Sequence, residues 1–196
     1  LKHPKINKID SVIIDSYPGG YKAVEPLYRL GHDRIAIIAG NMKVSTAVSR
    51  TKGAKKALAD YGLKFDPRLF IECNYSAELA HQAAQRLLAM KTPPTAIFAQ
   101  DDSMALGVRE AVLSAGLKIP EDLAIVGFDD INVCALTGIE LTTISQKKYE
   151  MGIMAAKILI DKITGETPSM VNKIVLDAEL IIRKSCGYSR LGAYRR

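Results

Sequence analysis

The chain has 196 residues, of which 48% are hydrophobic, a composition that excludes wholesale disorder. Its 27 lysines and arginines exceed its 21 aspartates and glutamates, which gives a net charge of +6. Part of this excess lies at the two ends of the chain, which we interpret as solvated tails rather than DNA contacts (Lys2, Lys5, Lys8, Arg190, Arg195 and Arg196). No apolar run approaches the roughly 20 residues of a membrane span, and the first ten residues do not resemble a signal peptide. We therefore expect a cytoplasmic protein without a membrane partner.

Cysteines and histidines predict neither a metal site nor a disulfide framework. Cys73, Cys134 and Cys186 are an odd number and lack CxxC spacing. They are expected to be small buried residues in a reducing cytoplasm. The three histidines are scattered, so no metal or cofactor is expected.

Short apolar runs and longer amphipathic runs alternate along the first 130 residues. In chain order they predict a strand at 11–15, a helix at 20–31, a strand at 34–40, a helix at 46–62, a strand at 68–72, a helix at 76–91, a strand at 95–100, a helix at 102–116 and a strand at 123–128. Pro26 is expected to kink the first helix or shift its start. Ser76 is the expected N-cap of the third helix. The alternation predicts right-handed βαβ units, and the wholly apolar strands predict a parallel sheet with helices on both faces.

The order changes after residue 130. The run 141–144 is expected to be extended and 146–165 to be a long helix that ends at a glycine. Two further strands are expected at 173–177 and 179–183. The fold class is therefore α/β, with a doubly wound parallel sheet.

Polar side chains follow four of the predicted strands. Parallel strands place ligands beyond their carboxyl ends, so these residues are expected to face one crevice. They are Thr46 and Arg50, then Asn74 and Tyr75, then Gln100, Asp101 and Asp102, and last Asp129 and Asp130. Carboxylates accept hydrogen bonds from hydroxyls, arginine donates them, and tyrosine packs on an apolar face. The set indicates a binding site for a polyhydroxylated or polar small molecule.

Other kinds of site are less well supported. No GxGxxG follows a strand, and neither a phosphate-binding GxxxxGK[ST] nor a GxSxG elbow occurs. No nucleophile or histidine falls at a neighbouring strand end, although an aspartate-based phosphoryl-transfer enzyme stays open. Simple structural roles also stay open: Asp101 or Asp102 could cap the helix beginning near Ser103, with Asp102 the expected cap, and Asp130 could cap a turn or short helix. Arg50 could be a solvated helix charge and Tyr75 a rim aromatic.

Several ordered motifs resemble the ligand-binding core of the LacI/GalR family of bacterial transcriptional repressors. They are "RLGHDRIAIIAG", "SRTKGAKKAL", "PTAIFAQDDSMALGV", "GLKIPEDLAIVGFDD" and "LTTISQ", and the ending "LIIRKSC" resembles the family's L-x-x-R-x-S. The resemblance covers about residues 11 to 185 and implies the two-lobed fold of type I periplasmic binding proteins. It assigns 15–143 and 177–185 to the C-terminal lobe. The segments 1–14 and 146–174 become remnants of the N-terminal lobe, and 186–196 a basic tail.

The resemblance also implies site residues. The family's effector-binding positions fall on Arg50, Asp129, Tyr75, Asp101, Thr46 and Gln146. Asp101 stands where the family usually has asparagine, so the hydrogen bonds offered to the effector differ or a positive group is preferred. Pro26 stands in place of the usual histidine.

The function implied is not enzymatic. The chain is expected to be the effector-binding core of a DNA-binding regulator, with a small polar effector, a sugar, held between two lobes. Operator DNA would be bound only by an N-terminal head that lies outside this chain. A homodimer would form through 102–116, where Leu106, Val112 and Leu113 offer apolar contacts. The alternative is a periplasmic sugar-binding protein of a transport system.

Overall fold

A four-stranded parallel sheet forms the centre of the protein in the computed structural model, which describes residues 9–165 and 170–188. Its strand order is β3-β2-β4-β5, from Phe70–Glu72, Ile35–Ala39, Ala96–Ala99 and Ala124–Val126. All residues of β2, β4 and β5 are buried, as continuous apolar runs predict. The basic residues singled out at the two ends of the sequence lie outside the described residues.

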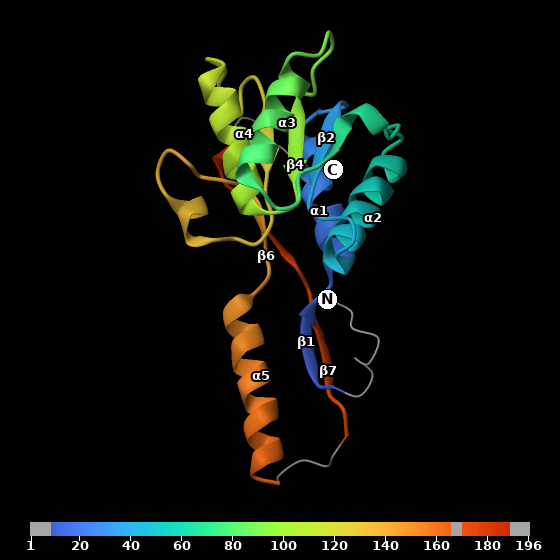
Figure 1. Cartoon of the computed structure of the whole chain (residues 1–196), viewed down its shortest axis with the longest axis vertical. Coiled ribbons are helices and arrows are strands. Elements are labelled where there is room, and N and C mark those ends of the chain that lie inside the picture. Colours follow the sequence, from blue (N-terminus) through green and yellow to red (C-terminus); the bar gives the residue numbers. More distant parts are fainter. Residues whose placement is uncertain (1–8, 166–169, 189–196) are drawn as a thin grey trace.

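Helices cover both faces of this sheet (Figure 1). The helices are α1 (Ser16–Arg29), α2 (Ser45–Asp60), α3 (Ala77–Leu88) and α4 (Asp102–Ser114). Successive residues of β2 point to opposite faces: Ile35 and Ile37 pack with α1 and α2, whereas Ala36 and Ile38 pack with α3 and α4. The predicted doubly wound α/β fold is therefore confirmed.

The first strand, the strand that pairs with it and the last helix lie apart from this sheet (Figure 1), whereas the segment 142–145 runs along β5 and accepts hydrogen bonds from Gly127 N and Asp129 N. β1 (Ser11–Ile14) pairs in parallel with β7 (Lys173–Leu176), and β6 (Thr143–Ser145) pairs antiparallel with β8 (Glu179–Ile181). α5 (Lys148–Ile163) has no buried residue among those described. Its exposed apolar side chains include Ile153, Leu159, Ile160 and Ile163. The division of the chain into lobe segments stays a prediction.

The N-termini of two helices show how well capping can be read from sequence. Ser76 caps α3 as predicted, and its hydroxyl accepts a hydrogen bond from Leu79 N at 3.2 Å. The prediction for α1 was wrong at its start. The helix begins at Ser16 rather than residue 20 because Asp15 is the N-cap and accepts from Tyr17 N at 3.1 Å. Pro26 lies inside α1 and is buried there.

The three cysteines are buried and free, in agreement with the prediction that they are small interior residues. Burial raises the pKa of the Cys73 thiol to about 11 and that of Cys134 to about 12. Among the described helices, none is both long and apolar enough to cross a membrane.

Candidate ligand-binding site

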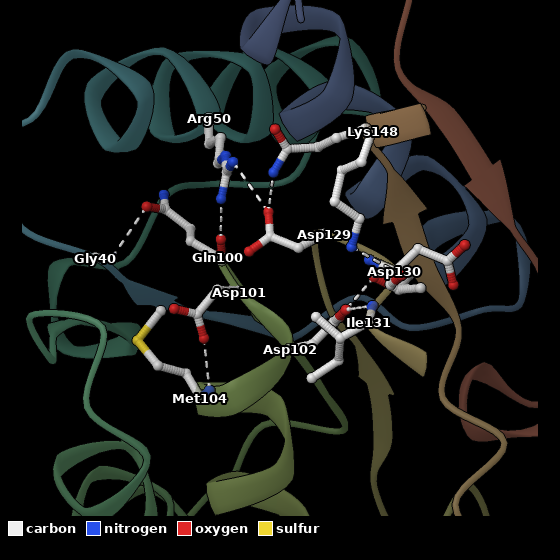
Figure 2. A network of polar contacts seen from close by, with 12 residues as sticks. Gly40, Arg50, Gln100, Asp101, Asp102, Met104, Asp129, Asp130, Ile131 and Lys148 are labelled. Atoms are coloured by element: carbon white, nitrogen blue, oxygen red, sulfur yellow. Dashed lines mark hydrogen bonds and ion pairs between the residues drawn. The ribbon is translucent and has the colours of Figure 1, made fainter. Parts of the chain in front are cut away.

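Arg50 stands at the centre of a network of polar contacts beyond the carboxyl ends of β4 and β5 (Figure 2). Its Nη2 lies 3.2 Å from Asp129 Oδ1, and its Nη1 donates to the carbonyl oxygen of Gln100. Arg50 is only 5% exposed, and burial lowers the pKa of its guanidinium while Asp129 opposes that shift. The alternative that Arg50 is a solvated helix charge is therefore wrong.

The close approach of α1 and α2 positions Arg50. A Cβ at Gly20 of α1 would lie 2.1 Å from the carbonyl oxygen of Arg50, so only glycine allows the two helices to meet there. The ring of Phe128 supports the guanidinium, with Arg50 Cζ 3.6 Å from the ring centroid. Gly19 leaves room for that ring, because a Cβ there would lie 2.8 Å from Phe128 Cζ. Gly19 and Gly20 together therefore form a packing surface for Phe128 and for the backbone of Arg50.

Asp129 is held in an unusual backbone conformation two residues beyond Gly127. Its φ of 112° lies in a region that residues other than glycine rarely occupy. Its N–H donates to Ile144 O at 2.8 Å, which fixes the segment after β5 against β6. Asp129 Oδ1 accepts from Arg50 and from Gln146 Nε2. Burial raises the pKa of the Asp129 carboxyl, and Arg50 and Gln146 counteract this. The structure therefore brings Arg50, Asp129 and Gln146 together, as the resemblance implied.

Gln100 is a further residue of the network; it was among the polar residues expected at the strand ends, but not among the positions that the resemblance implied. It is fully buried at the end of β4, where its Oε1 accepts from Gly40 N at 3.1 Å and its Nε2 donates to Thr51 Oγ1 at 2.7 Å. It therefore ties the end of β2 to α2, while its backbone carbonyl receives Arg50. A polar residue directly after a buried strand was the signal in the sequence.

Asp101 is the N-cap of α4, a role expected for Asp102. Its Oδ1 accepts from Met104 N at 2.6 Å (Figure 2). Asp101 is 8% exposed, and burial raises the pKa of its carboxyl to about 6.

Asp102 is instead a structural anchor one residue inside α4. It is 1% exposed, and its two oxygens accept from Thr143 Oγ1 at 2.6 Å and from Ile131 N at 2.9 Å. A Cβ at Gly127, the residue after β5, would lie 2.2 Å from Asp102 Oδ1. Glycine therefore leaves the space that this carboxylate occupies. Asp102 thus joins α4 to the segments on which Asp129 and Gln146 lie.

Asp130 was expected to cap a turn or short helix, and this prediction was wrong. The short 3-10 helix Asn132–Ala135 follows, but Ile131 is its N-cap and makes no side-chain cap bond. Asp130 pairs instead with Arg183, at 2.8 Å between Oδ1 and Nη2. Arg183 lies far from Asp130 along the chain, so the local sequence around Asp130 could not predict this ion pair.

The aromatic and hydroxyl residues complete the surroundings of Arg50. Tyr75 follows β3 with a φ of 60°, and its ring lies against Gly40, where a Cβ would be 2.2 Å from Tyr75 Cζ. Tyr75 acts electrostatically on Arg50 and raises its pKa. Thr46 is half-buried one turn before Arg50 on α2, a spacing that places both residues on the same side of the helix. The structure records no hydrogen bond between either residue and the Arg50–Asp129 pair among the described side chains.

The arrangement can hold a ligand by hydrogen bonds, since it offers fixed acceptors and donors in one place. Asp101 and Asp129 are charged acceptors, Arg50 and Gln146 are donors, and Tyr75 is an aromatic ring. Arg50 Nε is buried without a hydrogen-bond partner in the described part of the chain, so the network is not fully satisfied as it stands. Three or more His, Cys, Asp or Glu side chains do not gather at a candidate metal position in the described ranges.

Known proteins resemble the chain in both sequence and structure. A family model for a periplasmic binding protein-like domain matches residues 24–186. The HTH-type transcriptional repressor PurR of Haemophilus influenzae (strain PittEE) is 38% identical over 172 residues, covering 87% of this chain and 51% of that protein. The chain thus spans about half the length of the curated relatives it matches.

Solved structures of transcriptional regulators have the same fold. A complex of the transcriptional regulator CelR with cellobiose has a TM-score of 0.84 at 33% identity, covering 94% of this chain and 56% of that one. A LacI family regulator from Enterococcus faecium with bound ribose has a TM-score of 0.82 at 32% identity, covering 90% and 65%. The alternative of a periplasmic sugar-binding protein is not favoured, because these similar proteins are transcriptional regulators.

Proposed function

The chain belongs to the periplasmic binding protein-like domain family, as a LacI/GalR-type effector-binding domain, and we propose that it binds a small polar effector at Arg50 and Asp129. The effector is a sugar or a similar polar metabolite. Cellobiose and ribose, which two structural neighbours carry, are the first compounds to consider.

The observation that carries this proposal is the Arg50–Asp129–Gln146 linkage, in which Arg50 is buried and the other two residues are partly buried. Two side chains, Arg50 from α2 and Gln146 from the segment after β6, converge on one carboxylate oxygen of Asp129, which follows β5. A buried charged pair is weak evidence for added stability, because removing both charges from water is costly. A ligand that exchanges hydrogen bonds with these groups supplies the missing reason for placing them there.

Arg50, Asp129 and Gln146 would contact the effector directly, with Tyr75, Asp101 and Thr46 around it. Asp129 also bonds to Gln146 on the segment that leads to α5, so an effector at Asp129 acts on the connection to the rest of the protein. It can shift the arrangement of two lobes only by its different affinity for each arrangement. In the whole protein that shift would change operator affinity through a DNA-binding head.

Calorimetric titration of the full-length protein with a panel of sugars, including cellobiose and ribose, tests the site. Arg50→Ala is expected to weaken the best binder by roughly 10- to 100-fold, since a hydrogen bond to a charged group contributes about 1.5–3 kcal/mol. The matched control is Lys52→Ala, which removes an exposed positive charge two residues away on α2. Equal affinities for wild type, Arg50→Ala and Asp129→Ala would refute the assignment.

The remaining parts of the proposal concern the assembly and its DNA. Residues 1–196 alone are expected not to bind operator DNA specifically, and a sequence-specific, salt-resistant gel shift would contradict this. A homodimer is proposed through the face of α4 that carries Leu113, which is 41% exposed. Val112 from the same expected set is fully buried and belongs to the core. Sedimentation velocity on Leu113→Asp would test the contact.

A further inference from the structure

Buried carboxylates outnumber buried cations around the candidate site, where Asp101, Asp102 and Arg50 are buried. Asp101, Asp102 and Asp129 act electrostatically on one another, and their burial raises the pKa of each carboxyl. Arg50 is the only buried cationic residue of the described chain. Lys148 also influences Asp129, but its exposed ammonium bonds to the carbonyl of Asp130 at 3.1 Å. The site therefore holds two buried carboxylates and the partly buried Asp129 against one buried cation.

The three carboxylates differ in what the protein supplies to them (Figure 2). Both oxygens of Asp102 receive donors, from Thr143 and Ile131. Asp129 Oδ1 receives Arg50 and Gln146, and Asp101 Oδ1 receives Met104 N. Among the described contacts, no hydrogen bond reaches Oδ2 of either Asp101 or Asp129. Each of these two residues therefore keeps one carboxylate oxygen for another donor.

Helix capping does not account for the charge of Asp101. Asparagine and aspartate cap helices about equally well through one side-chain oxygen, so the bond to Met104 N requires no carboxylate. The N-terminus of α4 favours a negative charge, but burial opposes it more strongly, since it raises the pKa of Asp101 to about 6. A buried carboxylate is stabilised when a positive group desolvates with it and donates to it. The free oxygen of Asp101 is where such a group would bind.

We propose that the effector carries a protonated amino group next to hydroxyls, as an amino sugar does, and that Asp101 selects it. The ammonium would donate to Asp101 Oδ2 and a neighbouring hydroxyl to Asp129 Oδ2. The inference rests on the proposed function, since it concerns the ligand class of the same site.

Matched pairs of ligands test the inference by calorimetry on the full-length protein at neutral pH. The pairs are D-glucose with D-glucosamine, D-galactose with D-galactosamine and D-mannose with D-mannosamine, with the N-acetylated forms as uncharged controls. At least one amino sugar is expected to bind about 10-fold or more tightly than its parent hexose and its N-acetyl form.

The matched variant is Asp101→Asn, which keeps the cap and the shape but removes the charge. Its unfolding midpoint, followed by circular dichroism, is expected to stay close to that of the wild type. The preference for the amino sugar is expected to fall to about 1-fold in this variant, because the amide oxygen caps Met104 N and an NH2 donor then stands where Asp101 Oδ2 would accept from the ammonium group.

Three outcomes would overturn the inference. They are hexoses that bind as tightly as their amino forms, an amino-sugar preference that survives Asp101→Asn, and no binding by any member of the pairs. The proposed function is judged separately by Arg50→Ala. If hexoses bind without preference and Arg50→Ala still removes that binding, the inference fails while the proposed function stands.

Discussion

Ser185, near the end of the described chain, joins the crossover segment before β6 to β5. Its hydroxyl accepts from Thr142 N at 2.8 Å and donates to Ile125 O at 2.7 Å, and the residue is 4% exposed. Ser185→Ala would leave both buried backbone groups without this partner. An unsatisfied buried group costs about 1–3 kcal/mol, so we expect a loss of roughly 2–4 kcal/mol in the free energy of unfolding.

Thermal unfolding followed by far-ultraviolet circular dichroism measures this loss. For a chain of this size about 1 kcal/mol shifts the midpoint by roughly 2–4 °C, so Ser185→Ala should lower it by roughly 5–15 °C. Ser114→Ala is the control, because this exposed hydroxyl makes only a 3.5 Å contact with Glu110. Its effect should stay within about 0.5 kcal/mol. If Ser185→Ala is as stable as Ser114→Ala, the reasoning about buried hydrogen bonds at this position is wrong.

Three further predictions concern packing, capping and thiol reactivity. Gly127→Ala should lower the free energy of unfolding by about 1–3 kcal/mol in urea titrations, because its Cβ would meet Asp102 Oδ1. The control Gly152→Ala has open space on α5 and should raise the free energy of unfolding by up to about 1 kcal/mol. Equal effects of the two substitutions would contradict this reasoning. Ser76→Ala should cost about 1 kcal/mol of unfolding free energy through loss of the α3 cap, and no measurable loss would exclude a stabilising cap. Burial raises the pKa of the Cys134 thiol to about 12, so this thiol should resist iodoacetamide in the native protein at about pH 8 and react once the protein is unfolded. Peptide mass spectrometry would measure the labelling. Fast labelling of the native protein would refute the burial of Cys134.

Local sequence was a good guide to the elements of the central sheet. The wholly apolar runs in β2, β4 and β5 predicted buried parallel strands, since such runs are favourable only when helices cover both faces. Ser76 predicted the start of α3 because a cap acts within three residues of itself. The start of α1 was not predicted, because Asp15 follows an apolar run and was assigned to the strand 11–15. In the structure Asp15 is the N-cap of α1.

The candidate site was predicted only in outline. Strand order brings chain segments with Arg50, Asp129 and Gln146 to one edge of the sheet, and the resemblance to a known family named the positions. The separate roles of adjacent aspartates were not readable. Asp101 and Asp102 are both compatible with a cap, and the choice depends on Thr143, which lies 41 residues further along the chain.

What the sequence by itself determined is the set of elements, the parallel α/β class and the polar ends of the strands. These follow from hydrophobic periodicity and capping, which act over a few residues. Only the tertiary structure decided that Asp130 pairs with Arg183 and that Gly20 admits the backbone of Arg50. It also decided that Phe128 lies under the guanidinium. Those contacts join residues far apart in the chain, and their energies depend on burial and distances that arise only when the chain has folded.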